Sequence, residues 1–129
     1  MNAHRKLRLL VHPWRLVIAR LPASTPLAQA VAVLPAAGFA SIVRSPESVT
    51  LVYEAEAGNT TGEIWRAIEV AGSFAFSETG VLAAIAAPLA EAGVSIFAVN
   101  SYETDFVLVH ERDLERAREA VDKAGHLLG

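Results

Sequence analysis

Two short polar segments of this chain carry the residue types that could do chemistry. Residues 77–80 read Ser-Glu-Thr-Gly at the start of an alanine-rich stretch, and residues 101–105 lie between two apolar stretches. Free backbone N–H groups at a helix N-terminus, together with the positive end of the helix dipole, can hold an anion. The N–H of Gly80 could therefore bind the carboxylate of a small ligand whose amino group meets Glu78. This pattern predicts a binding pocket rather than an active site.

Each of these residues also has a purely structural interpretation. Glu78 could stabilise the helix start by its charge alone, an effect of about 0.3–1 kcal/mol. Gly80 could relieve backbone strain, or it could let a ligand approach the main chain closely. Asp105 is of a type disfavoured in strands, so it either caps the turn or faces a polar ligand. Ser101 and Tyr102 supply hydroxyl groups that could line a pocket or only pack within the turn.

The residue pattern gives catalysis little support. An enzyme that used Glu78 and Asp105 as acid and base would need both carboxylates within about 5–10 Å on one cleft. Ser101, His110 and Asp105 could form a triad on paper, but no Gly-x-Ser-x-Gly turn accompanies them. The four histidines have no metal-ligand spacing, and no glycine-rich nucleotide motif occurs. We therefore expect no catalytic residues, no metal and no cofactor.

The composition is that of a folded protein with an ample core. The 129 residues are 53% hydrophobic and 19% charged, with a net charge of −3 and no cysteine. This length suits one domain or two small half-domains. The lack of cysteine excludes disulfides and thiolate sites and agrees with a cytoplasmic protein. There is no basic face with stacking aromatic residues and no run of about 18 apolar residues, so neither a nucleic acid nor a membrane is expected as a partner.

Runs of Val, Ile and Leu predict the strands. They occupy residues 7–21, 39–45, 48–54, 65–73, and the apolar stretches on either side of residues 101–105. The first run is expected to form two strands around His12-Pro13, because proline cannot sit in a central sheet ladder. The segment 56–62 is rich in Gly, Asn and Thr and is predicted to be a polar connection.

The first predicted helix covers residues 23–38 and carries signals at both ends. Its expected boundary residues are Ser24 or Thr25 as the N-cap, Pro26 at the first helical position, and Pro35 with Gly38 at the end.

Two further helices are predicted in the second half. Residues 80–92 are apolar nearly all round and contain Pro88, so this helix is expected to be buried on more than one side, either between half-domains or in a dimer. Residues 111–126 have one apolar face, with acidic residues at the start. Lys123 and His126 near the end are in line with the helix dipole.

The chain contains an internal repeat. Residues 35–54 and 90–111 both run from Ala-Gly through an apolar strand and a turn with Ser and Glu to a second strand that ends Leu-Val-x-Glu. Such self-similarity is a fold-level signal. It predicts two helix–strand–strand units packed side by side.

The second half of the chain resembles the ACT domain, a ferredoxin-like regulatory module that binds amino acids. The resemblance rests on an ordered pattern: Glu78-Thr79-Gly80, an alanine-rich helix, a strand, and then Ser101-Tyr102-Glu103-Thr104-Asp105. Within the family it looks most like small tandem-ACT proteins and cytosolic arginine sensors, and the repeat extends it to the first half. It implies an α+β, ferredoxin-like fold of two ACT-like subdomains, residues 1–62 and 63–129, side by side, with antiparallel sheets covered by helices.

The same resemblance implies a non-catalytic regulatory module whose ligand is an amino acid. The ligand would lie between the strand-to-helix loop and the facing hairpin turn of the second subdomain. The residues implied at this site are Glu78, Thr79, Gly80, Val81, Ser101, Tyr102 and Asp105. The two acids would favour a cationic or zwitterionic ligand. The first half has no glycine at the matching place, and no equivalent site is expected there.

The resemblance also implies partners. Units of this family often pair side by side across a dimer, so a homodimer is expected. They are usually attached to enzymes, and because no enzyme domain is evident here, an unidentified protein partner is expected as well. An interaction domain that kept the fold and lost the ligand is the alternative.

Overall fold

The computed structural model describes residues 6–56, 58, 62–71 and 80–129. The chain divides into two compact units: unit 1 comprises residues 1–13 and 66–129, and unit 2 comprises Trp14–Trp65. Each unit has its own cluster of buried apolar residues. The subdomain limits of 1–62 and 63–129 remain a prediction, because compactness alone does not define an ACT-like subdomain.

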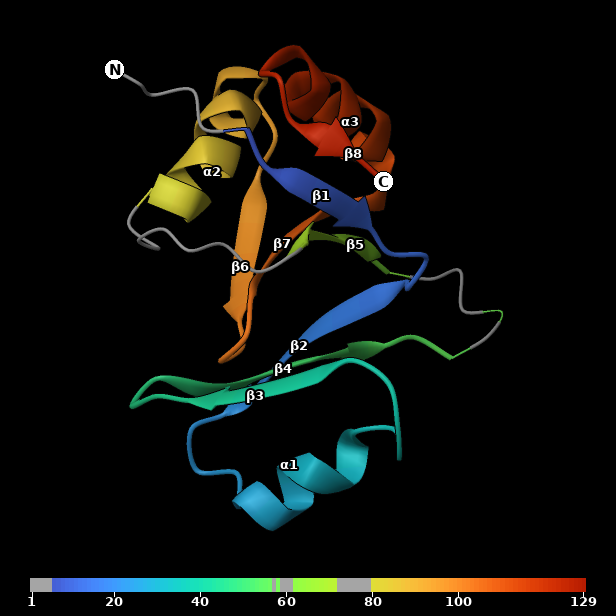
Figure 1. Cartoon of the computed structure of the whole chain (residues 1–129). Helices are drawn as coiled ribbons and strands as arrows, with labels where there is room; N and C mark the ends of the chain where they lie inside the picture. The colour runs from blue at the N-terminus through green and yellow to red at the C-terminus, as the bar shows by residue number, and fades with distance from the viewer. Residues whose placement is uncertain (1–5, 57, 59–61, 72–79) are drawn as a thin grey trace. The chain divides into compact units, whose positions relative to one another are not determined.

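Unit 1 contains a sheet with the strand order β6-β7-β5-β1-β8 (Figure 1). Its strands are β1 (Arg8–Val11), β5 (Trp65–Ala71), β6 (Ile96–Asn100), β7 (Asp105–His110) and β8 (Leu127–Leu128). Its helices are α2 (Val81–Glu91) and α3 (Leu114–Lys123), and a 3-10 turn, η2 (Glu111–Asp113), precedes α3. The order β5-α2-β6-β7-α3-β8 is the strand-helix-strand-strand-helix-strand pattern of the ferredoxin-like fold. The predicted α+β, ferredoxin-like class is confirmed.

One strand of this sheet comes from the start of the chain. β1 pairs antiparallel with β5, with Leu9 opposite Val70, and parallel with β8, with Leu9 opposite Leu128. It therefore lies between the first and last strands of the ferredoxin-like unit. The apolar run predicted the strand itself but not these distant partners.

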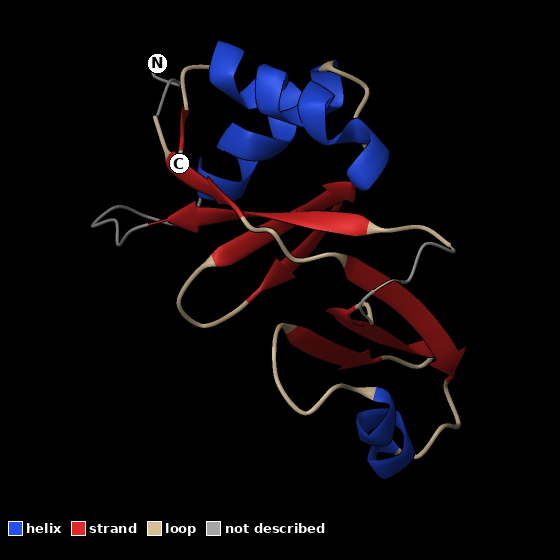
Figure 2. Ribbon diagram, turned by 90° about the vertical axis from the view of Figure 1, so that its right-hand side faces the viewer, coloured by secondary structure: helices blue, strands red, loops and turns tan. Residues whose placement is uncertain are grey.

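The helices α2 and α3 lie over one face of this sheet (Figure 2). Ile85 and Leu89 of α2 and Val121 of α3 are fully buried, in one cluster with Leu9 of β1 and Val107 of β7. Burial of such a side chain contributes about 1.5–3 kcal/mol. This cluster is the main source of stability in unit 1.

The alanine-rich helix α2 packs one side against the core of unit 1. Val81, Ile85 and Leu89 are buried, whereas Ala83 and Ala87 are exposed. Within unit 1 the large apolar side chains of α2 face the core and its outer side carries alanines, so burial of that outer side between half-domains or in a dimer stays a prediction. Among the residues that the structure describes, no helix is long and apolar enough to cross a membrane.

Unit 2 contains a smaller sheet and one helix. Its elements are β2 (Leu16–Pro22), α1 (Leu27–Val33), β3 (Ala40–Arg44) and β4 (Ser48–Glu54). The strands are antiparallel in the order β3-β4-β2, and Ala30 of α1 packs against Val49 and Leu51 of β4. Both copies of the repeat thus fold as a helix followed by an antiparallel hairpin, α1-β3-β4 and α2-β6-β7.

The start of α1 differs from the prediction. The N-cap is Pro26, in extended conformation (φ −60°, ψ 141°), and no side chain caps the helix. Ser24 and Thr25 are therefore not caps, because the chain still turns at this point, with the N–H of Thr25 bonded to the carbonyl of Pro22. The helix ends at Val33, before Pro35, in agreement with the predicted stop.

Candidate functional site

Ser101 holds the turn between β6 and β7 in one conformation. Its N–H donates to the carbonyl of Thr104 (2.8 Å), and its Oγ accepts from the N–H groups of Glu103 (3.3 Å) and Thr104 (3.1 Å). Serine is favoured in turns because its hydroxyl bonds nearby backbone groups in this way. Ser101 therefore has the structural role that its sequence position left open, and its part in a ligand site stays a prediction.

Thr104 fastens this turn to the end of β5. Its Oγ1 donates to the carbonyl oxygen of Val70 at 2.6 Å. Val70 lies one residue before the end of β5, from which the chain runs on to Gly80. The hairpin turn is thus anchored to β5, the strand that precedes Gly80 in the chain. The sequence pattern named Thr104 only as part of the turn.

Asp105 begins β7 opposite Asn100 of β6. When the Asn100 amide is oriented to satisfy its neighbours, its NH2 group donates to Asp105 Oδ1 (3.1 Å) and to the carbonyl of Val99 (3.3 Å). An ionised carboxylate has about four acceptor positions. Asp105 is half-buried, and the bond from Asn100 uses one of these positions on Oδ1. Asn100 was not identified from the sequence, although counting outward from the turn pairs it with Asp105.

Gly80 is the N-cap of α2, with φ −99° and ψ −4°. Any residue adopts these angles, so relief of backbone strain does not explain the glycine. Its absent side chain leaves the second interpretation, in which a ligand approaches the main chain closely. Gly80 has no side chain that could cap α2, and the three residues before it lie outside the described part of the chain, so the binding of a ligand by the first N–H groups of α2 stays a prediction.

The remaining predicted site residues differ in their placement. Val81 is 6% exposed and packs in the core of unit 1, so its backbone rather than its side chain would face a ligand. The Tyr102 side chain is fully exposed at the tip of the turn. Glu78 and Thr79 lie outside the described residues, so the predicted convergence of Glu78 with Asp105 stays a hypothesis.

A second polar cluster joins β1, β5 and η2 in unit 1. His12 Nε2 lies 2.6 Å from Glu69 Oε1, and both side chains are less than a quarter exposed. Arg66 donates from Nη2 to the carbonyl of His12 (2.9 Å), and its Nη1 lies 3.5 Å from Glu111 Oε2. These contacts tie the N-terminal strand to β5. No group of three or more acidic or histidine side chains in the described part of the chain could hold a metal ion.

His126 is a buried structural residue that was not identified from the sequence. It is 4% exposed; its Nδ1 accepts the N–H of Leu7 (3.1 Å), and its Nε2 donates to the carbonyl of Ala84 (2.8 Å). Because Nδ1 accepts, the ring is neutral. The expectation that His126 acts as a cation at the helix end is therefore wrong. The residue instead ties the N-terminal segment and α2 to the chain after α3.

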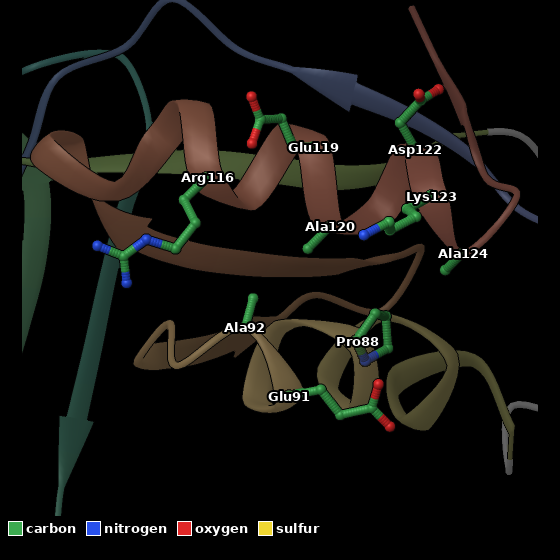
Figure 3. Close-up of a pocket in the computed structure, with 9 residues that line it drawn as sticks. All are labelled: Pro88, Glu91, Ala92, Arg116, Glu119, Ala120, Asp122, Lys123 and Ala124. Carbon is green, nitrogen blue, oxygen red and sulfur yellow. The ribbon is translucent and has the colours of Figure 1, made fainter.

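A groove of about 730 Å³ lies between α2 and α3, away from Gly80. Its lining includes Pro88 and Ala92 at the end of α2, and Ala120 of α3. Ala92 and Ala120 face each other across the groove, whereas the carboxylates of Glu119 and Asp122 point away from it (Figure 3). No predicted site residue lines this groove, because Gly80 begins α2 and the groove lies at its opposite end.

Comparison with known proteins identifies the domain that carries the hairpin and α2. Residues 60–123 match the family model of the ACT domain. A human protein named CASTOR3P is 32% identical over 92 residues, which are 59% of this chain and 56% of the relative. The bovine protein named cytosolic arginine sensor for mTORC1 subunit 1 is 32% identical over 72 residues, which are 55% of this chain and 22% of the relative. The chain thus spans about half the length of the first relative and about a fifth of the second.

A solved structure is similar to nearly the whole chain. The crystal structure of protein Atu0741 from Agrobacterium tumefaciens matches with a TM-score of 0.80 at 30% identity, covering 97% of this chain and 93% of that chain. The ferredoxin-like element order, the start of α2 at Gly80 and the turn anchored by Thr104 all lie within or beside the residues that match the family model. Residues 60–123 are an ACT domain, and this chain belongs to the ACT domain family.

Proposed function

We propose that this chain is a non-catalytic regulatory module that binds an amino acid beside Gly80 and the β6–β7 turn. The observation that carries the proposal is the bond from Thr104 to Val70, which holds the turn at the end of β5. In this arrangement the first N–H groups of α2 bind the ligand carboxylate. Asp105, oriented by Asn100, binds a positive group of the ligand.

The ligand class follows from charge and from the relatives. A carboxylate facing the site favours a cationic or zwitterionic amino acid. The bovine relative is named an arginine sensor, and it shares 32% identity over the matched residues. We take arginine as the first amino acid to test, with the other nineteen beside it.

The setting of the module is part of the same proposal. The module pairs with a second copy of itself and acts in the cytoplasm on a protein partner that is still to be identified. Family membership supports the regulatory role, and the name of the bovine relative supports the compartment.

A Gly80→Val substitution tests the close approach of a ligand to the main chain. The φ and ψ of Gly80 suit any residue, so the fold should keep its melting temperature within a few degrees. Amino-acid binding measured by isothermal titration calorimetry should fall at least tenfold, because the valine side chain occupies the space of the ligand. The matched control is Ala87→Val, at an exposed position of the same helix. Equal binding by the Gly80 variant and the control would argue against a ligand at this position.

Two other functions remain as alternatives. An interaction domain without a ligand is favoured by the fully exposed Tyr102, since a rigidly presented aromatic residue suits a protein interface. A small enzyme based on Glu78 and Asp105 is the weaker alternative. Absence of amino-acid binding with retained capture of a protein partner would favour the first alternative.

A further inference from the structure

The groove between α2 and α3 has an apolar floor that belongs to the core of unit 1. Ala92 at the end of α2 and Ala120 of α3 both pack against the buried cluster of that unit, and they face each other across the groove (Figure 3). Pro88 and Ala124 extend this floor. Because these side chains are small, they leave about 730 Å³ open between the two helices. An apolar side chain placed here would extend the existing core.

The two walls of the groove carry opposite charges. On the α3 side, Arg116 and Lys123 extend over the groove, whereas the carboxylates of Glu119 and Asp122 point away from it (Figure 3). On the α2 side, the charged residue that lines the groove is Glu91. Within the part of the chain that the structure describes, neither Lys123 nor Glu91 forms an ion pair. Both charges can therefore meet opposite charges on a bound partner.

The spacing of the two cations suits a helical partner. Arg116 and Lys123 are seven residues apart, which is two turns or about 10 Å along a helix. Arg116 also pairs with Asp113 through Nη2 (3.3 Å), and its guanidinium has further N–H donors. A helix that runs along α3 can present two carboxylates at the same seven-residue spacing, with apolar side chains between them. A small molecule would need two anionic groups about 10 Å apart on an apolar body.

We infer that this groove is the docking site for an amphipathic helix of a partner protein; the inference rests on the protein partner proposed above and assigns it a surface and a chemistry. The partner helix carries apolar residues at helical spacing, which fill the groove over Ala92 and Ala120. Two acidic residues seven positions apart on one flank meet Arg116 and Lys123, and a basic residue on the other flank meets Glu91. The opposite charges of the two walls fix the direction in which the helix lies.

The test uses a synthetic fluorescent peptide of about five helical turns, with a leucine stripe, glutamates seven positions apart on one flank and lysines on the other. Fluorescence anisotropy should show saturable binding to the unchanged chain. Lys123→Glu should weaken this binding at least tenfold, because attraction becomes repulsion at one end of the groove, and Arg116→Gln should weaken it as well. Glutamate and glutamine are good helix formers, so α3 should persist, and circular dichroism checks this.

Arg118→Glu is the matched control. It makes the same charge change on α3, but Arg118 does not line the groove, so the peptide should bind this variant within about twofold of the unchanged chain. A second peptide, with lysines on both flanks, should bind Lys123→Glu more tightly than it binds Arg118→Glu. The two variants have the same net charge, so this preference would come from contact in the groove.

Three results would contradict the inference. The first is a lack of saturable binding by the peptide with mixed flanks, and the second is an equal loss of its binding in Lys123→Glu and Arg118→Glu. The third is tighter binding of free decanedioate, whose carboxylates lie a similar distance apart, since the groove would then be a small-molecule site. A dimer of the unchanged chain that Lys123→Glu dissociates would assign the groove to a second copy and would also overturn the inference.

Amino-acid binding by the same variants separates this inference from the ligand site. It should not change, because Gly80 begins α2 and the groove lies at the opposite end of that helix. Failure of the peptide to bind would therefore leave the amino-acid site standing, and failure to bind an amino acid would leave the docking groove standing.

Discussion

An Asp105→Asn variant is expected to bind its amino acid about 10- to 100-fold more weakly than the unchanged chain while folding equally well. A hydrogen bond to a charged group contributes about 1.5–3 kcal/mol, which corresponds to this range. Asparagine has the same shape, and Asn100 can still donate to its oxygen. The hairpin should therefore keep its pairing. Isothermal titration calorimetry measures the affinity, and thermal unfolding measures the fold.

Glu103→Gln is the matched control for this experiment. It removes the same charge from the neighbouring turn, where Glu103 is exposed and bonds to Ser101 only through its backbone. If Asp105 contacts the ligand directly, the Glu103 variant should bind nearly as well as the unchanged chain. If both variants lost affinity equally, the effect would come from the overall negative charge of the turn, and the assigned contact between Asp105 and the ligand would be wrong.

A His126→Leu variant is expected to lower the free energy of unfolding by about 2–5 kcal/mol. It leaves the buried N–H of Leu7 and the carbonyl of Ala84 without their partners, and each unsatisfied group costs about 1–3 kcal/mol. This is a large part of the roughly 5–15 kcal/mol that stabilises a domain. Chemical denaturation followed by circular dichroism measures the loss.

Two further variants show which bond matters. His126→Asn can place an oxygen near the Nδ1 position and accept from Leu7, and His126→Gln can place an NH2 near the Nε2 position and donate to Ala84. Both should be intermediate between the leucine variant and the unchanged chain. A leucine variant within about 0.5 kcal/mol of the unchanged chain, the range of an ordinary surface substitution, would show that the two bonds carry little stability.

The second and third helices and all strands except β8 could be predicted because their signals are local; β8 was not predicted. The break at His12-Pro13 and the start of α2 at Gly80 follow from neighbouring residues. The N-cap of α1 could not be predicted, because Ser24 and Thr25 are equally suited to the turn that they form there. The residues before Pro26 correctly predicted that a helix begins here, but the predicted N-caps, Ser24 or Thr25, lie one or two residues before the observed N-cap, Pro26.

Long-range contacts account for what could not be predicted. The place of β1 between β5 and β8, and the burial of His126 against Leu7 and Ala84, depend on residues far apart in the chain. No periodic pattern marks His126 as buried. At the candidate site, the β6–β7 hairpin could be predicted from a polar turn flanked by apolar strands. The bond from Thr104 that anchors this turn to strand β5 could be found only in three dimensions.

Thermal unfolding of the unchanged chain with each of the twenty amino acids tests whether this ACT-family chain binds an amino acid. At least one of them, with arginine tested first, should stabilise the fold in a concentration-dependent way. At about 100 times its dissociation constant a ligand adds roughly 2.7 kcal/mol, which is readily measured. If none of the twenty raises the melting temperature at millimolar concentration, the chain is not an amino-acid-binding module.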